Sequence, residues 1–83
     1  MTNHYVYRPD VLAALLRHGA RPNDHTPPEL VRDFVRDLYR HELKRLRARL
    51  LRKEFPKNEY AGRVVELRKR YPVLVLRARE WVE

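Results

Sequence analysis

The longest part of the chain without glycine or proline runs from residue 29 to residue 55, between Pro27-Pro28 and Pro56. Thr26 as N-cap, Pro27 in the first turn and Glu29 reaching back form a helix start signal, so we expect one dominant long helix over about residues 27–54. At 1.5 Å per residue this helix is about 42 Å long. A compact sphere of this chain length is only about 30 Å across. The long helix must therefore protrude, or run through an elongated bundle or a dimer.

The apolar positions of this helix change direction along its length. At about 100° per residue, the apolar residues of the first half (30, 31, 34, 35 and 38) centre about 120° away from those of the second half. We expect the first half to pack on a short preceding helix, and the second half to pack on a third helix or on another chain. Because the helix is longer than its domain and has two apolar faces, we predict a homodimer. The apolar residues of the second half have 4-3-4 spacing and are the predicted dimer interface: Tyr39, Leu43, Leu46 and Leu50.

Two shorter helices are predicted on either side of the long one. The first begins at Pro9, carries a stripe of apolar residues over about ten positions, and ends at Gly19, which fits a left-handed C-terminal cap. The third follows Asn58 as a candidate N-cap and has apolar residues at 60, 64, 67 and 71. Pro72 ends it.

Beyond Pro72, the apolar run 73–76 is typical of an extended segment, and residues 79–82 are expected to form a closing turn that seats Trp81 on the core. The run 73–76 would pair with residues 5–7 in a small two-stranded ribbon, and the alternative is a pair of unpaired extended arms. Tyr5 and Tyr7 are expected to be the least buried tyrosines. The expected fold class is all-α: one small helical domain over residues 1–83, with three helices and extended N- and C-terminal segments.

Several kinds of catalytic site are excluded by composition. The chain contains neither Cys nor Ser, which removes disulfides, thiolate metal sites and the usual nucleophiles. Its histidines lack the HxxxH spacing of a helical metal site, and Asp37 with His41 is interpreted as a surface ion pair. We therefore expect no catalytic residue, no metal and no cofactor. An enzyme that uses only Arg and Lys side chains on an anionic substrate would instead need these side chains in a closed cavity.

The location of the chain is predicted only by default. No apolar run reaches the roughly 18 residues of a membrane span, and the first residues lack a signal-peptide pattern. A cytoplasmic protein that does not associate with membranes is expected. The absence of Gln and Cys and the single Met resemble the composition of thermophile proteins.

The net charge of +8 is concentrated in one part of the chain. Residues 1–39 and 71–83 are each neutral, whereas residues 40–70 hold twelve basic and four acidic residues. Such segregation favours a surface for an anionic partner, most simply RNA or DNA. The predicted nucleic-acid-binding residues are eleven of these twelve basic residues: Arg40, Lys44, Arg45, Arg47, Arg49, Arg52, Lys53, Arg63, Arg68, Lys69 and Arg70.

Other functions remain open. The basic face would be only a solvated surface in a thermophile-like helix, or it would bind an acidic protein. The main alternative function is a homo-oligomeric interaction or assembly module that acts through the apolar faces of the long helix.

Overall fold

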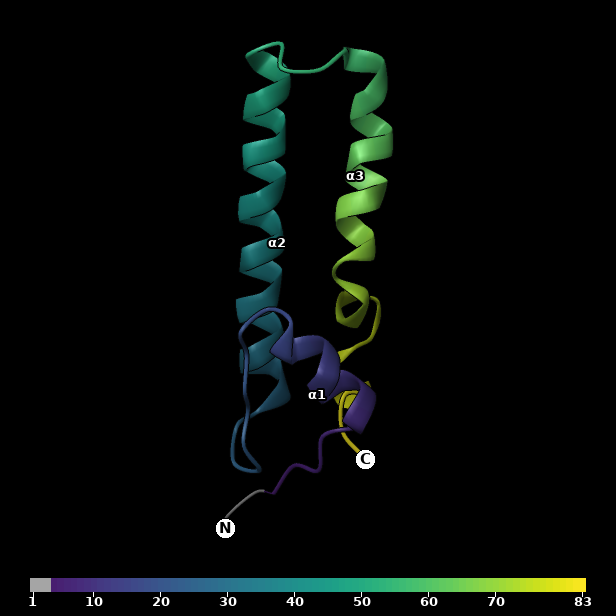
Figure 1. Ribbon diagram of the computed structural model, residues 1–83. Coiled ribbons are helices and arrows are strands. Elements are labelled where there is room, and N and C mark those ends of the chain that lie inside the picture. The colour runs from purple at the N-terminus through teal and green to yellow at the C-terminus, as the bar shows by residue number, and fades with distance from the viewer. Residues whose placement is uncertain (1–3) are drawn as a thin grey trace.

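The computed structural model describes residues 4–83. The molecule is elongated, with principal extents of 53 × 18 × 18 Å. Its helices are α1 (Pro9–Leu16), α2 (Pro28–Leu51) and α3 (Tyr60–Lys69), and three short 3₁₀ turns are η1 (Lys57–Glu59), η2 (Pro72–Val75) and η3 (Ala78–Glu80). Figure 1 shows α2 and α3 side by side as a hairpin, with α1 and the C-terminus at the end opposite the hairpin tip. The all-helical fold class is thus confirmed for the described residues.

The start of α2 differs from the prediction. Pro27 is the N-cap, and no side chain caps the helix. The Thr26 hydroxyl instead donates to Asn23 Oδ1 (3.0 Å) and accepts from the Asn23 backbone N–H (3.1 Å). The expected capping box with Glu29 is therefore wrong, because the preceding turn uses the Thr26 hydroxyl.

The end of α2 also comes earlier than expected. The Glu54 N–H donates to Arg49 O and the Lys53 N–H donates to Leu50 O, which is the hydrogen-bond pattern of a Schellman cap. Lys53 has φ 60°, the left-handed conformation that this cap requires. A glycine usually marks such a cap in the sequence, and this segment has none. The predicted helix therefore continued to residue 54. Gly19, with φ 77°, closes α1 as predicted.

The start of α3 differs as well. Asn58 lies inside η1, and α3 begins at Tyr60 without a side-chain cap. The predicted apolar stripe of α3 faces the core: Leu67 and Tyr71 are buried, and Tyr60 and Val64 pack against them. The α3 helix packs against α2. Of the two predicted partners for the second half of α2, a third helix or another chain, the third helix is the one observed.

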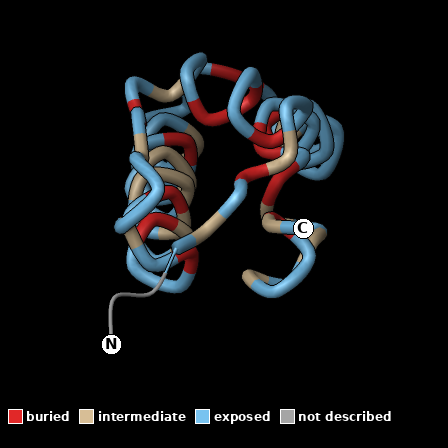
Figure 2. Tube along the Cα trace, turned by 90° about the horizontal axis from the view of Figure 1, so that it is seen from below, coloured by how far each residue is buried: buried red, intermediate tan, exposed pale blue. Residues whose placement is uncertain are grey.

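The core is densest near the chain termini. Trp81, Leu15, Val11 and Val35 are the largest fully buried side chains. Trp81 Nε1 donates to Val73 O at 3.0 Å, so the prediction that a closing turn seats Trp81 on the core is confirmed. Figure 2, viewed along the long axis, shows the buried positions on the sides where the helices and the C-terminal turns face one another.

The predicted ribbon is not seen among residues 4–83. Residues 72–75 form the 3₁₀ turn η2, which packs on α1 and on the first half of α2. Tyr7 makes a single antiparallel bridge with Val82 instead. Tyr7 is also buried, and its hydroxyl donates to Thr26 O at 2.6 Å, so the expectation that it is one of the two least buried tyrosines is wrong.

The neighbours of α2 change along its length. Its first half was expected to pack mainly on the short first helix, but η2 and η3 occupy that side. The reason is that the chain returns antiparallel to α2 after the hairpin turn, which brings the C-terminal turns beside the first half. None of the helices within residues 4–83 is long and apolar enough to cross a membrane.

Candidate functional site

The basic residues predicted to bind nucleic acid lie on the α2–α3 hairpin. Ten of the eleven are exposed, and Arg63 is half-buried. They do not form one continuous surface, because the row of residues that faces α3 divides them. On α2 this row is Tyr39, Leu43, Leu46 and Leu50, which pack against or belong to the core.

Helix geometry places the charges on two flanks of this row. A residue one position after a member of this row is rotated by about 100° around the helix axis, toward one side. A residue three positions after a member is rotated by about 60° toward the other side. Arg40, Lys44 and Arg47 are at the first kind of position. Glu42 and Arg49 are at the second.

The second flank is a groove between α2 and α3 of about 740 Å³. Basic and acidic residues alternate along it. Its charged lining comprises Glu42, Arg45, Arg49, Glu59, Arg63, Glu66 and Arg70. All of the acidic residues of 40–70 belong to this flank, except for Glu54, which binds Arg49 from the hairpin turn. The groove is therefore a surface of mixed charge.

Ion pairs hold several of these cations. Glu54 accepts from Arg52 Nε at 2.7 Å and from Arg49 Nε at 3.2 Å. These hydrogen bonds lower the pKa of Glu54, and the bond from Arg52 has the largest effect. Arg63 pairs with Glu59 at 3.2 Å, and its guanidinium carbon lies 4.1 Å from the centre of the Phe55 ring. Lys69 pairs with Glu66 at 3.2 Å.

The first flank carries basic residues without acidic neighbours from the same stretch. Arg68 of α3 is one position after Leu67, so it lies on the same side of the hairpin as Arg40, Lys44 and Arg47. We call these four residues the basic flank. Within residues 4–83 none of them is joined to an acidic side chain by an ion pair. Two exposed apolar side chains at equivalent positions, Leu51 (74% exposed) and Val65 (47% exposed), adjoin it.

Basic residues spaced four, four, four and three positions apart indicate one basic row along α2: Arg32, Arg36, Arg40, Lys44 and Arg47. In the structure the free part of this row begins later than the spacing indicates. Arg32 is in line with the row, but its guanidinium donates to Leu76 O and to Leu74 O, both at 2.9 Å. Arg36 is paired with Asp33 at 3.1 Å. Arg32 is therefore a structural residue that fixes η2 on α2, and within residues 4–83 the first cation of the row with neither an ion pair nor a side-chain hydrogen bond is Arg40.

The residues of the predicted dimer interface are engaged within the chain. Leu46 is buried, and Tyr39, Leu43 and Leu50 pack against the core on the α3 side. A dimer contact through these four side chains would require the α2–α3 hairpin to open. The most exposed large apolar residues of α2, apart from Leu51, are Leu30 and Phe34 near its start.

A polar cluster lies where the hairpin meets α1. The Tyr71 hydroxyl donates to Glu42 Oε2, and the Tyr71 ring stacks on His18 with 4.3 Å between ring centres. Burial, together with the hydrogen bond to Glu42, raises the pKa of Tyr71 to about 12. Tyr71 is thus held as a neutral hydrogen-bond donor. By contrast, His41 and Asp37 are both exposed on α2, and no ion pair joins them.

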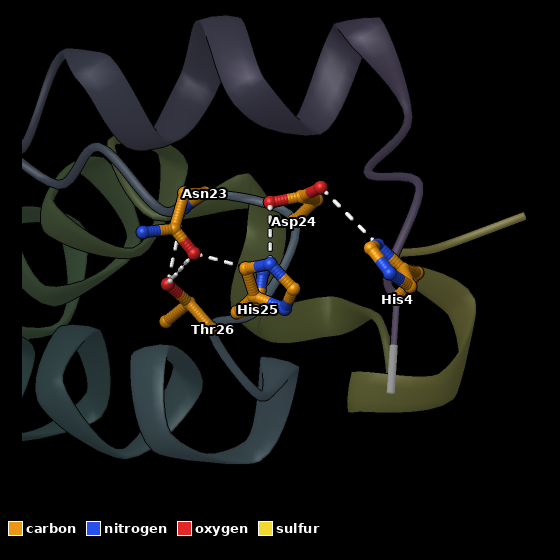
Figure 3. Close-up of polar contacts among 5 residues, drawn as sticks. All are labelled: His4, Asn23, Asp24, His25 and Thr26. Atoms are coloured by element: carbon orange, nitrogen blue, oxygen red, sulfur yellow. Dashed lines mark hydrogen bonds and ion pairs between the residues drawn. The ribbon is translucent and has the colours of Figure 1, made fainter. Parts of the chain in front are cut away.

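One group of potential ligands was missed by the sequence reasoning. His4 lies beside Asp24 and His25 in the structure, although about twenty residues separate them in the chain (Figure 3). No local spacing signals this contact, because it depends on the N-terminal segment crossing the loop before α2. Of the three residues, only Asp24 and His25 are neighbours in the sequence.

Comparison of the chain with protein-family models, with curated proteins and with solved structures finds no match.

Proposed function

We propose that this chain is a small, non-catalytic binding module that engages nucleic acid through the basic flank of the α2–α3 hairpin. The observation that carries the proposal is the separation of charge across the hairpin. The acidic residues of 40–70 lie in the groove or at the hairpin turn, whereas Arg40, Lys44, Arg47 and Arg68 form no ion pair with an acidic side chain of residues 4–83. A surface with four such cations attracts a polyanion and releases counterions when it binds.

The dimensions also support this function. Arg40 and Arg47 are about 10 Å apart along the helix axis, with Lys44 between them. Phosphates of one DNA strand recur every 3.4 Å along the duplex axis, so one face of α2 can contact several phosphates of one backbone. The neighbouring Leu51 and Val65 would then lie against sugars or exposed bases. Little sequence preference is expected, since Arg and Lys contacts to phosphate carry no sequence information directly.

The proposal is tested by binding of labelled duplex and single-stranded RNA and DNA, followed by fluorescence anisotropy. If each of the four cations neutralises one phosphate, log affinity for duplex DNA falls against log salt with a slope of about −3.5. Between about 50 mM and 200 mM salt this slope corresponds to an affinity loss of about 100-fold.

A charge-matched pair of variants separates a specific surface from general basicity. Substitution of Arg40, Lys44 and Arg47 by Glu should remove binding. The control changes three exposed arginines elsewhere, R21E/R77E/R79E, and alters the net charge by the same amount. Both variants should keep the fold, because exposed charges contribute about 1 kcal/mol or less each. Equal losses in the two variants, or no binding by the unaltered chain at low salt, would refute the proposal.

A second function is favoured by the exposed apolar residues at the start of α2. Leu30 is 64% exposed and Phe34 is 50% exposed, and their i, i+4 spacing puts them on one face. A homo-oligomeric assembly module would bury this face against a second copy. Light scattering coupled to size exclusion distinguishes a 10.1 kDa monomer from a dimer, and L30E/F34E should return a dimer to monomer. A monomer that does not bind nucleic acid would contradict both functions.

A further inference from the structure

Three side chains with metal-binding atoms meet at the end of the molecule that holds the chain termini. His4 Nδ1 is 3.2 Å from Asp24 Oδ2, and His25 Nε2 is 3.6 Å from Asp24 Oδ1. The two imidazole rings are 4.7 Å apart at their centres. One ligand atom from each of the three residues can be chosen so that all lie within 4.8 Å of one another. Figure 3 shows both imidazoles beside the same carboxylate.

The backbone, and not the ion pairs, brings these residues together. The Tyr5 N–H donates to Asp24 O at 2.7 Å, which fixes the segment after His4 on the loop. The loop itself is a closed turn, since Asn23 Oδ1 accepts from the His25 N–H at 2.8 Å and from the Thr26 hydroxyl at 3.0 Å. Exposed ion pairs are too weak to impose such an arrangement, because they contribute about 1 kcal/mol or less. The three side chains are therefore placed together by hydrogen bonds that do not involve them.

We propose that His4, Asp24 and His25 form a binding site for Zn²⁺. Two imidazole nitrogens and one carboxylate oxygen are ligands that zinc accepts, at bond lengths of about 2.0 to 2.2 Å. A tetrahedral ion with such bonds needs ligand atoms about 3.4 Å apart. The two nitrogen–oxygen distances, 3.2 Å from His4 to Oδ2 and 3.6 Å from His25 to Oδ1, are close to this value, although each nitrogen faces a different oxygen of Asp24. One ligand atom from each residue can be chosen so that no pair is more than 4.8 Å apart, and side-chain rotation must close the remaining gap to about 3.4 Å.

The exposure of the site determines what kind of zinc site it is. All three side chains are more than half exposed, so a fourth position faces solvent and is open to water or to a ligand from another molecule. Each imidazole nitrogen that faces the carboxylate would bind the metal in place of a proton. Zinc at this position would tie the N-terminal segment to the loop that leads into α2.

Because these ligands are distant in the chain, the site exists only in the folded protein. Zinc therefore stabilises the folded state by mass action. For a domain of this size, zinc at about ten times its dissociation constant should raise the melting temperature by about 5 °C or more.

The experiment uses the full chain without a polyhistidine tag, freed of metal with a chelator and titrated with zinc chloride in a calorimeter. One zinc per chain is expected, with a dissociation constant in the micromolar range. His25→Ala and Asp24→Asn should each weaken zinc binding at least about tenfold, because even the loss of an outer-shell partner of a ligand costs about 10- to 100-fold in metal affinity. His41→Ala is the matched control, because His41 is an exposed histidine on α2 outside the site.

A second measurement locates the ion independently of affinity. In proton–carbon NMR spectra, zinc should shift the imidazole resonances of His4 and His25 and leave those of His18 and His41 in place. The proposal is overturned if the chain takes up no zinc at submillimolar concentration, if His41→Ala weakens binding as much as His25→Ala, or if all four histidines shift together.

Discussion

Arg32 provides the sharpest test of how this fold is held together. By spacing it is the first member of a basic row on α2, yet its guanidinium donates to Leu74 O and Leu76 O. We predict that Arg32→Met destabilises the protein strongly. Methionine keeps the unbranched aliphatic stem and a similar helix propensity, so the substitution removes mainly the two hydrogen bonds.

The magnitude follows from the number and kind of bonds lost. A hydrogen bond to a charged group contributes about 1.5 to 3 kcal/mol. Arg32 is half-buried, so the two bonds together should contribute near the lower end of the combined range of about 3 to 6 kcal/mol or slightly below it, at about 2 to 4 kcal/mol. Two carbonyls at η2 also lose their charged partner, which weakens the packing of the C-terminal turns on α2. For a domain of this size the melting temperature should fall by about 10 °C or more.

The matched control is Arg40→Met, the same substitution two turns further along α2. Arg40 is exposed and has no ion pair within the described residues, so the change in free energy of unfolding should be within about 0.5 kcal/mol. Urea unfolding followed by circular dichroism and by the fluorescence of Trp81 gives both free energies. Trp81 is the only tryptophan and lies in the turn region that Arg32 supports.

The two variants should behave oppositely in nucleic-acid binding. Arg32→Met should bind as the unaltered chain does, and Arg40→Met should bind more weakly. Equal stabilities of the two variants would refute the structural role of Arg32. A loss of salt-dependent binding in Arg32→Met alone would return this residue to the basic surface.

Two further predictions concern single positions. Gly19→Ala should destabilise the protein by about 1 kcal/mol or more, because φ is 77° at this position. Gly62→Ala should stabilise it by about 0.5 to 1 kcal/mol, since Gly62 is in α3 and an added Cβ would meet open space. Thermal unfolding of both variants checks these opposite signs. The pKa of Tyr71 is raised from 10.0 to about 12, so the folded protein keeps the phenol proton where the unfolded chain loses it, and stability should decrease as the pH rises through this interval. Tyr71→Phe should reduce that decrease, as measured by urea unfolding at several alkaline pH values, and an unchanged pH dependence would contradict the assignment.

The sequence alone predicted the helical class and the order of the helices. Proline and glycine punctuate the chain, and apolar residues recur with helical spacing between them. Both signals act within a few residues, so they can be interpreted without knowing the rest of the fold. Helix ends were less well predicted: Thr26 is used by the preceding turn, and Lys53 adopts a left-handed conformation without being glycine.

The candidate sites could be predicted only in part. Charge counting along the chain found the basic stretch 40–70, because composition needs no geometry. The sequence could not show that this stretch is divided into a groove of mixed charge and a basic flank. The division depends on the packing of α3 on α2, which brings the acidic residues of the two helices together.

The tertiary structure decided every feature that depends on distant residues. Residues 73–76 are typical of an extended segment, yet residues 73–75 belong to the 3₁₀ turn η2, because α1, Arg32 and Trp81 contact this segment and no strand of residues 4–83 lies beside it. His4 meets Asp24 and His25 only through the path of the N-terminal segment. Local preferences differ by about 1 kcal/mol or less per residue, whereas burial of a side chain or pairing of a buried polar group contributes more. Packing therefore overrides the local signal wherever the two disagree.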